Sequence, residues 1–300
     1  MTPEFTCIAL VGRPADPPVA EALVALARHA LGRGMRVRVD AASGLDYDPG
    51  VEAVPERELV VSANLMVSVG GDGTLLYTAR LLGDYDVPLL GINRGRLGFL
   101  ADISAAEMLD RFDDVLQGQY ERDVRRTLLA RLITPDAEEK TSIALNDVVL
   151  QKRDTGRMLD FESFINGHFV NAHGGDGLVV STATGSTAYA LSCGGPILTP
   201  DIDAIVIAPI SPHTLSDRPL VVGGQSTIEL RLVAQAPIRA EITCDGALLG
   251  DLAVDGRLVI EPSSKRVTLL HPPGYDYFRI LRSKLHWGRG GRQGPPDSRC

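Results

Sequence analysis

The stretch LMVSVGGDGTLLYTAR, residues 65–80, joins an apolar run to a helical pattern through three glycines and one aspartate. The apolar run predicts the end of a buried strand, and Thr74 is expected to begin a helix. Gly70, Gly71 and Gly73 allow positive φ and close approach, so backbone N–H groups can face a phosphate at the helix N-terminus. The stretch therefore predicts a strand–loop–helix unit with an anion-binding corner.

Asp72 places a carboxylate inside this corner, where a bare phosphate cradle would repel it. The residue makes chemical sense if it acts on a hydroxyl beside the phosphates, or holds a divalent cation that bridges them. The alternative is that Asp72 caps the helix and the glycines only make a turn. The order of residues is neither G-x-x-x-x-G-K-[ST] nor G-x-G-x-x-G, and no G-x-S-x-G or H-E-x-x-H occurs. P-loop, dinucleotide-fingerprint, esterase and metalloprotease readings are therefore excluded.

Composition bounds the class of protein. The 300 residues are 44% hydrophobic, which is typical of a globular chain large enough for two domains. No apolar run reaches the roughly 18 residues of a membrane span, and the N-terminus has no basic segment or cleavage site, so we expect a cytoplasmic protein. A net charge of −8 argues against nucleic acid as a partner. The four scattered cysteines form no metal or disulfide pattern.

Two kinds of pattern divide the chain. In the first third, strands alternate with helices, which indicates an α/β domain with a parallel sheet; a capping-box form at Ser104–Glu107 predicts the start of a further helix. From Arg122 onward short strands predominate, including a hairpin at Asn166–Gly167, and they suggest a β-rich, sandwich-like domain. We expect domains at 1–121 and 122–271, a C-terminal segment at 272–288 that packs back on the first domain, and a disordered tail at 289–300. The strands expected in the second region are 125–134, 142–151, 158–170, 177–183, 204–210, 226–233, 239–246, 257–262 and 266–271.

Two further clusters carry polar chemistry. Asp176 lies between glycines ahead of a strand, and the Thr/Ser-rich turn TATGSTAY follows, with Tyr189 placed to stack on a planar ligand. The alternative is a turn that caps a short helix, with Tyr189 as ordinary packing. Asn146 and Asp147 interrupt an apolar run, which is costly unless they are paired; they suit the edge of a base or ribose hydroxyls, or simply a turn between strands.

Together these motifs resemble the bacterial NAD kinase family, and the resemblance covers nearly the whole chain. The matching segments are GGDGTLL, GINRGRLGFLADI, LNDVVL, DGLVVSTATGSTAYALSCGGPI, HTLSDRPLVV and HPPGYDYFRILRSKLHWG. GGDGT alone is less specific, because lipid kinases have a similar loop. The resemblance implies transfer of the γ-phosphoryl of ATP to the adenosine-ribose 2′-hydroxyl of NAD. It also implies a divalent metal, usually Mg²⁺, and a homodimer or homotetramer.

The resemblance also implies roles for individual residues. Asp72 matches the aspartate that takes the proton from the 2′-hydroxyl, and Asn146 and Asp147 match a pair that contacts the NAD adenosine. No metal ligand follows from the motifs. The positions implied to contact NAD are Asp72, Gly73, Asn146, Asp147, Arg157, Asp176, Thr187, Ala188, Tyr189 and Ser192, and those of the phosphate loop are Gly70, Gly71, Gly73 and Thr74.

The chain departs from the family pattern at three places. Ala183 stands where proline is usual, Gly174–Gly175 where Arg-Ser is usual, and Ala247 where glutamine is frequent. We expect weaker NAD affinity with the chemistry intact. Two alternatives stay open: a GGDGT-type lipid kinase, and a sensor that binds NAD(H) without turnover.

Overall fold

The computed structural model describes residues 5–95, 98–153, 158–214, 216–233 and 240–286. It divides the chain into two compact units. The first comprises residues 1–75, 88–122 and 270–300, and the second comprises residues 76–87 and 123–269. The sequence patterns did not predict the assignment of 76–87 to the second unit. The expected domain boundaries remain a prediction, and the tail expected at 289–300 lies outside the described residues.

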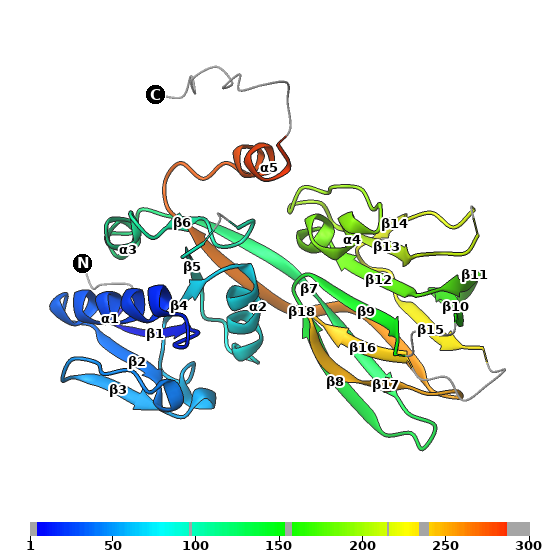
Figure 1. The fold of residues 1–300 in the computed structure, drawn as a ribbon, viewed down its shortest axis with the longest axis horizontal. Coiled ribbons are helices and arrows are strands. Elements are labelled where there is room, and N and C mark those ends of the chain that lie inside the picture. Colours follow the sequence, from blue (N-terminus) through cyan, green and yellow to red (C-terminus); the bar gives the residue numbers. More distant parts are fainter. Residues whose placement is uncertain (1–4, 96–97, 154–157, 215, 234–239, 287–300) are drawn as a thin grey trace. The chain divides into compact units, whose positions relative to one another are not determined.

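The first unit is built on a parallel sheet, as its alternating pattern predicts (Figure 1). The order across the sheet is β5-β4-β1-β2-β3, and the short β6 pairs in parallel with β5. The strands are β1 (Cys7–Gly12), β2 (Arg36–Asp40), β3 (Val51–Val54), β4 (Leu65–Gly70), β5 (Leu89–Asn93) and β6 (Ile103–Ser104). Strands β1, β4 and β5 read as continuous apolar runs because both of their faces are buried.

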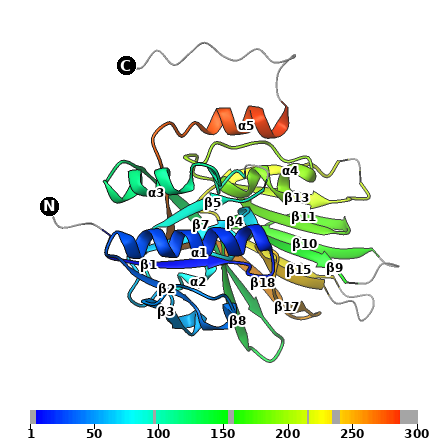
Figure 2. The ribbon, with the colours of Figure 1, turned by 60° about the vertical axis from the view of Figure 1, so that its left-hand side comes forward.

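Helix α1 (Pro17–Gly32) lies along β1 and β2 and buries one apolar stripe there (Figure 2). A proline in its first turn suits a helix start, since the missing N–H would have no partner there. Its buried leucines Leu23 and Leu26 join the core formed with the strands, and each stabilises the fold by about 1.5–3 kcal/mol. The unit also contains η1 (Ala41–Ser43), η2 (Glu56–Glu58), α3 (Met108–Leu116) and α5 (Tyr277–Leu285).

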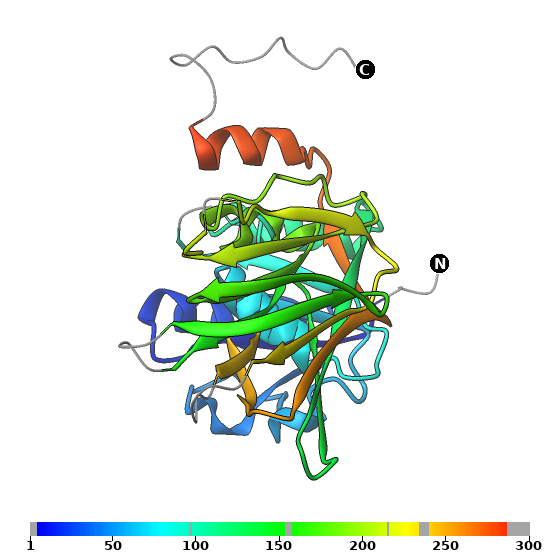
Figure 3. The ribbon, with the colours of Figure 1, turned by 90° about the vertical axis from the view of Figure 1, so that its right-hand side faces the viewer.

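The second unit is a two-layer antiparallel β structure, which agrees with the predicted sandwich-like class. One sheet has the order β14-β13-β12-β9-β16-β17, and the other contains β11-β10-β15-β18, with β7 pairing β18 and β8. Figure 3 turns the green and yellow strands of this unit toward the viewer. The strands are β7 (Glu121–Ile133), β8 (Glu139–Ala144), β9 (Asp147–Lys152), β10 (Leu159–Ile165), β11 (His168–Gly175), β12 (Gly177–Thr182), β13 (Ala204–Ile210), β14 (Leu220–Gly223), β15 (Ile228–Leu232), β16 (Ala240–Cys244), β17 (Ala247–Leu252) and β18 (Arg257–His271).

Apolar side chains from both sheets form the core of this unit. Phe161 of β10 and Leu230 of β15 belong to the same buried cluster as Leu150 of β9 and Val180 of β12. The opposite face of β9, β12 and β13 is also buried, against the short helix α4 (Tyr189–Ser192), which follows η3 (Thr184–Thr187). Burial on both faces explains why residues 177–182 show no alternation of polar and apolar side chains.

Several local expectations need correction. The strand expected at 142–151 is two strands, β8 and β9, which are interrupted at Leu145–Asn146 because the Asp245 carboxylate accepts from the backbone N–H groups there. The two strands expected at 257–262 and 266–271 are one long strand, β18. The Ser104 capping box is wrong: Ser104 Oγ bonds to the Glu107 carboxylate, and α3 begins at Met108 without a side-chain cap.

The Asn166–Gly167 hairpin is confirmed. Both residues have positive φ, at 51° and 79°, as a two-residue turn of this kind requires. Strands β10 and β11 pair antiparallel around it. The predicted C-terminal helix is present as α5, with Ile280 and Leu281 buried. Among the described residues, Cys7, Cys193 and Cys244 are free thiols.

Candidate active site

The glycine corner lies at the point where the strand order of the parallel sheet reverses. The chain passes from β1 outward to β2 and β3, and then returns to the other side of β1 with β4. In open α/β sheets, ligands bind outside the carboxyl ends of the strands at such a switch point. Strand β4 ends at Gly70, so this topology puts GGDGT where a ligand of the first unit would bind.

The corner requires glycine at its first position. Gly70 has φ of 155°, and a Cβ there would lie 2.3 Å from Oγ1 of Thr74. Helix α2 (Asp72–Leu81) begins directly afterwards, two residues earlier than expected, with Gly71 O accepting from the N–H groups of Thr74 and Leu75. The N–H groups that open a helix lack intrahelical acceptors and attract anions. The predicted strand–loop–helix unit is present, and anion binding at its corner stays a prediction.

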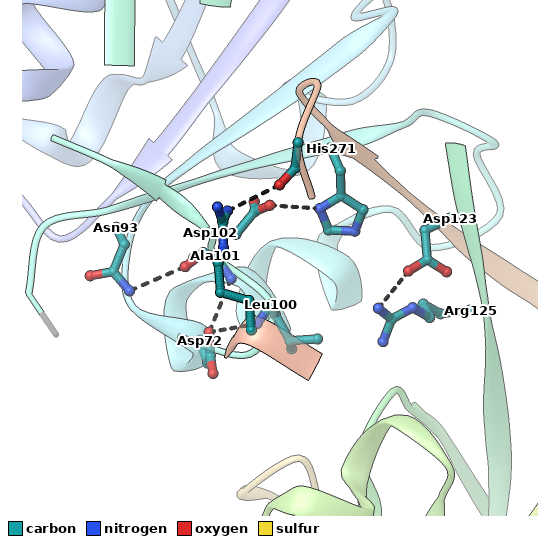
Figure 4. Close-up of polar contacts among 10 residues, drawn as sticks. Asp72, Asn93, Leu100, Ala101, Asp102, Asp123, Arg125 and His271 are labelled. Carbon is teal, nitrogen blue, oxygen red and sulfur yellow. Dashed lines mark hydrogen bonds and ion pairs between the residues drawn. The ribbon is translucent and has the colours of Figure 1, made fainter. Parts of the chain in front are cut away.

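The Asp72 carboxylate is held by three backbone N–H groups from one loop (Figure 4). Oδ2 accepts from the N–H of Phe99 at 2.8 Å, whereas Oδ1 accepts from Leu100 at 3.0 Å and Ala101 at 3.1 Å. Gly98 packs so closely that a Cβ on it would lie 1.9 Å from Oδ1. These bonds lead to the loop and not to the first turn of α2, so they do not form the helix cap that was the alternative reading.

With three bonds accepted from the loop, the Asp72 carboxylate can still accept another hydrogen bond. An ionised carboxylate has about four acceptor positions on its two oxygens. From the residues that the structure describes, Oδ1 accepts two bonds and Oδ2 accepts one, which leaves one position on Oδ2 for an incoming hydroxyl. Asp72 is also only half-buried. Its geometry therefore suits a group that accepts a proton or a hydrogen bond from a ligand.

In the second unit, Asn146 and Asp147 stand at the interruption between β8 and β9. The carboxylate of Asp245 accepts from three successive N–H groups, those of Leu145 at 2.7 Å, Asn146 at 2.8 Å and Asp147 at 3.1 Å. The backbone at this pair therefore forms the break between two strands that the alternative interpretation predicted. Within the described chain, Oδ1 of Asn146 is buried and has no hydrogen-bond partner. A buried acceptor of this kind is costly unless a ligand donates to it.

Burial and the nearby charge of Asp245 raise the pKa of Asp147 to about 7. Burial also raises the pKa of Asp245, although the three N–H donors act in the opposite direction. Those donors favour the anion of Asp245, so Asp147 is the member of the pair that holds a proton near neutral pH. Asp147 can therefore donate or accept a hydrogen bond, depending on pH.

The Thr/Ser-rich turn is bonded to the Asn146 backbone. The carbonyl of Asn146 accepts from the N–H of Thr182 at 2.9 Å and from Oγ of Ser181 at 3.1 Å. Oγ1 of Thr182 donates to the Leu145 carbonyl at 2.6 Å and accepts from the N–H of Gly185 at 3.1 Å. The Thr/Ser-rich turn and the Asn146–Asp147 pair, which are separate in the sequence, are therefore hydrogen-bonded to each other.

Tyr189 and Asp176 lie beside this site. Burial raises the pKa of Tyr189, and the charges of Cys193, Asp176 and Asp147 raise it further, which places these groups within electrostatic range of its hydroxyl. Asp176 pairs with Lys152 at 2.5 Å, and that hydrogen bond holds the pKa of its carboxyl below the ordinary value. The neighbouring predicted residues Thr187 and Ala188 are half-buried, and Ser192 is exposed.

Arg157, the remaining predicted contact, lies outside the described residues. Two polar residues, one buried and one half-buried, were missed by the sequence reasoning. Arg125 is 2% exposed, pairs with Asp123 at 2.5 Å and donates to Oγ1 of Thr184 at 3.2 Å. An Arg-Arg pair in a strand pattern gives no signal of which member is buried. Asp245 and Gly246 both have positive φ, and an Asp-Gly pair in a sequence predicts only a hairpin turn.

The fold and these clusters define the class: a two-unit nucleotide-binding protein with a carboxylate in the glycine loop before a helix N-terminus. The chain belongs to the ATP-NAD kinase family: the N-terminal domain of that family matches residues 10–120 and its C-terminal domain matches residues 145–271. The resemblance seen in the motifs is thereby confirmed.

Individual relatives match over nearly their full length. The NAD kinase of Methylococcus capsulatus is 41% identical over 287 residues, which cover 96% of this chain and 99% of the relative. The NAD kinase of Acinetobacter baylyi is 43% identical, with 95% and 93% covered. Yeast NADH kinase in complex with NADH has a TM-score of 0.89 at 26% identity, covering 98% of this chain and 91% of that chain. An Archaeoglobus fulgidus NAD kinase in complex with ATP has a TM-score of 0.73 at 26% identity, with 94% and 99% covered.

Proposed function

We propose that the protein is an NAD kinase that transfers the γ-phosphoryl group of ATP to the adenosine-ribose 2′-hydroxyl of NAD. The observation that carries the proposal is the Asp72 carboxylate, which keeps one acceptor position free of any described residue, at a corner suited to phosphate. Membership of the ATP-NAD kinase family supports the same substrates.

In this mechanism Asp72 accepts the proton of the 2′-hydroxyl as that oxygen attacks the γ-phosphorus. The bond from the γ-phosphorus to the β–γ bridging oxygen breaks, and ADP leaves. Phosphoryl transfer depends mainly on positioning and on stabilising charge, and a general base typically contributes about 10²–10⁴-fold. The loop of residues 99–101 keeps the carboxylate from rotating, so Oδ2 presents its free position in one direction. Gly70, Gly71, Gly73 and Thr74 surround the helix N-terminus that receives phosphate oxygens.

Asn146 and Asp147 contact the adenosine of NAD. The buried Oδ1 of Asn146 accepts from an N–H donor such as the exocyclic amino group of adenine. Asp147 bonds to a ribose hydroxyl, and the ring of Tyr189 lies against a planar part of the ligand. Asp176, Thr187, Ala188, Ser192 and Arg157 complete the proposed contacts with the dinucleotide.

A divalent cation, usually Mg²⁺, is part of the proposal. In the described chain no three or more His, Cys, Asp or Glu side chains are grouped to hold a metal. Mg²⁺ is commonly held by substrate phosphates with one or two protein carboxylates and several waters, so we propose that it enters with ATP. When bound it would neutralise phosphate charge, and no step of the mechanism above depends on a particular protein ligand for it.

Two broader expectations belong to the same proposal. We propose a homodimer or homotetramer, which light scattering on the purified protein would test. A cytoplasmic location is proposed as well; among the described residues, no helix is both long and apolar enough to cross a membrane.

The decisive experiment incubates the protein with ATP, magnesium and NAD, and detects NADP with an NADP-specific dehydrogenase. We expect NADP to accumulate in proportion to enzyme and to stop when ATP is omitted. Binding of NAD without NADP formation would favour the sensor alternative. Phosphorylation of a diacylglycerol or sphingosine in place of NAD would favour the lipid-kinase alternative. Either result would contradict the proposal.

A further inference from the structure

The loop that binds Asp72 is itself held at several points. Ala101 donates its N–H to Oδ1 of Asp72 at 3.1 Å, and its carbonyl accepts from Nδ2 of Asn93 at 3.3 Å. The same carbonyl accepts the N–H of Gly98 at 3.2 Å. The orientation of these peptide groups therefore decides where the carboxylate of Asp72 points.

The next residue along the chain, Asp102, is anchored by a histidine. Its side chain is 10% exposed, and Oδ2 lies 3.0 Å from Nδ1 of His271. Within the described chain the other oxygen, Oδ1, is buried and has no hydrogen-bond partner. The bond from His271 is thus the hydrogen bond that holds this carboxylate, and with it the end of the loop (Figure 4).

His271 is a rigid anchor. It ends the long strand β18, is 1% exposed, and its ring stacks on Tyr275 with centroids 3.7 Å apart and planes 11° from parallel. A carboxylate oxygen only accepts, so Nδ1 must carry the proton in this bond. His271, Asp102 and the loop belong to the same unit as Asp72.

We propose that His271 and Asp102 are a positioning pair for the catalytic carboxylate of Asp72. The pair fixes the backbone of residues 99–101, and that backbone aims the free acceptor position of Oδ2. This inference rests on the proposed function of Asp72 as general base. Misplacing a reacting group by about 1 Å can reduce a rate about 100-fold. Loss of the pair therefore lowers kcat, while the KM for NAD stays near the wild-type value because the proposed adenosine contacts are untouched.

Two substitutions of His271 separate the hydrogen bond from the ring. His271→Phe keeps a ring to stack on Tyr275 and removes the Nδ1 donor. His271→Asn removes the ring and keeps an N–H donor near the Nδ1 position. We expect His271→Phe to lower kcat by about 10–100-fold, with the NAD KM within about twofold of wild type. We expect His271→Asn to keep a clearly higher kcat, because the donor to Asp102 is restored.

A second pair serves if either His271 variant does not fold, as judged by circular dichroism. Asp102→Asn keeps an acceptor oxygen for Nδ1, whereas Asp102→Leu keeps none. The positioning pair predicts a higher kcat for Asp102→Asn than for Asp102→Leu. Equal kcat values in folded members of either pair would overturn the inference, as would an unchanged kcat in His271→Phe.

The Asp72→Asn background separates this inference from the proposed function. If the pair acts through Asp72, adding His271→Phe to Asp72→Asn lowers kcat no further. A second, multiplicative loss in the double variant would overturn the positioning role. Full activity of Asp72→Asn alone would instead remove the general-base role, whatever the His271 variants do.

Discussion

Replacing Asp147 by asparagine is expected to change how stability depends on pH. In the folded chain the carboxyl keeps its proton up to about pH 7, whereas its ordinary pKa is 3.8. Between these values the folded state binds more protons than the unfolded state, so the free energy of unfolding falls as pH rises. The stabilising contribution is complete below pH 3.8 and is lost by about pH 7.

The magnitude follows from the same two pKa values. Each pH unit between them changes the free energy of unfolding by about 1.4 kcal/mol, so the total is roughly 4 kcal/mol. Asparagine has nearly the same shape as the protonated acid and does not titrate. Asp147→Asn should therefore match the wild type near pH 4 and exceed its stability by roughly 4 kcal/mol near pH 8. Among the described residues, the titratable groups within electrostatic range of the Asp147 carboxyl are Asp245, Cys193, Cys244 and Tyr189, and the charge of Arg80 acts on Asp245 and Cys244.

Urea unfolding followed by far-UV circular dichroism at several pH values measures this difference. Asp176→Asn is the matched control. Its carboxyl has a lowered pKa because it pairs with Lys152, so it stabilises above pH 3.8 and that contribution is lost as pH falls. As pH rises, the free energy of unfolding of Asp147→Asn should increase relative to the wild type, whereas that of Asp176→Asn should decrease relative to the wild type. If the difference between Asp147→Asn and the wild type were the same at every pH, the burial argument would be refuted.

Three further outcomes are expected. Gly98→Ala should lower kcat by about 10–100-fold with little change in NAD KM, because the new Cβ displaces the Asp72 carboxylate. Gly95→Ala is the control, since its Cβ would lie no nearer than 3.8 Å to Asn93. Equal kcat values in the two variants would contradict the argument. Gly174→Arg should lower the NAD KM about 5–100-fold if the missing cation weakens binding; a Cβ there has room, with Oδ1 of Asp160 at 3.4 Å, and an unchanged KM would reject the idea. EDTA should abolish NADP formation and excess magnesium should restore it, and a full rate in EDTA would remove the proposed metal requirement.

Asparagine at position 72 has a structural consequence that the motif did not indicate. In Asp72→Asn, an NH2 group replaces one carboxylate oxygen. This NH2 group donates, so it would face at least one of the three N–H donors of residues 99–101. Leaving such a buried donor unpaired costs about 1–3 kcal/mol. Thermal unfolding should accompany every measurement on Asp72→Asn, so that lost folding is not mistaken for lost chemistry.

The sequence by itself determined the parts that depend on local pattern. The continuous apolar runs and helical spacing of the first third predicted the parallel α/β sheet, and Asn166–Gly167 predicted its hairpin, because positive φ is tolerated at few residue types. The motifs around Asp72, Asn146 and Tyr189 pointed to the family, since each joins special backbone geometry to a polar side chain.

Only the tertiary structure decided which groups those side chains meet. Asp72 bonds to N–H groups 27 to 29 positions away, and Asp147 owes its raised pKa partly to Asp245, which belongs to a distant hairpin. No local pattern encodes these pairings, because hydrogen bonds and charge interactions depend on distance in space and not along the chain. Arg125 and Asp245 were missed for that reason. Their burial, and therefore the energetic weight of their charges, exists only in the packed fold.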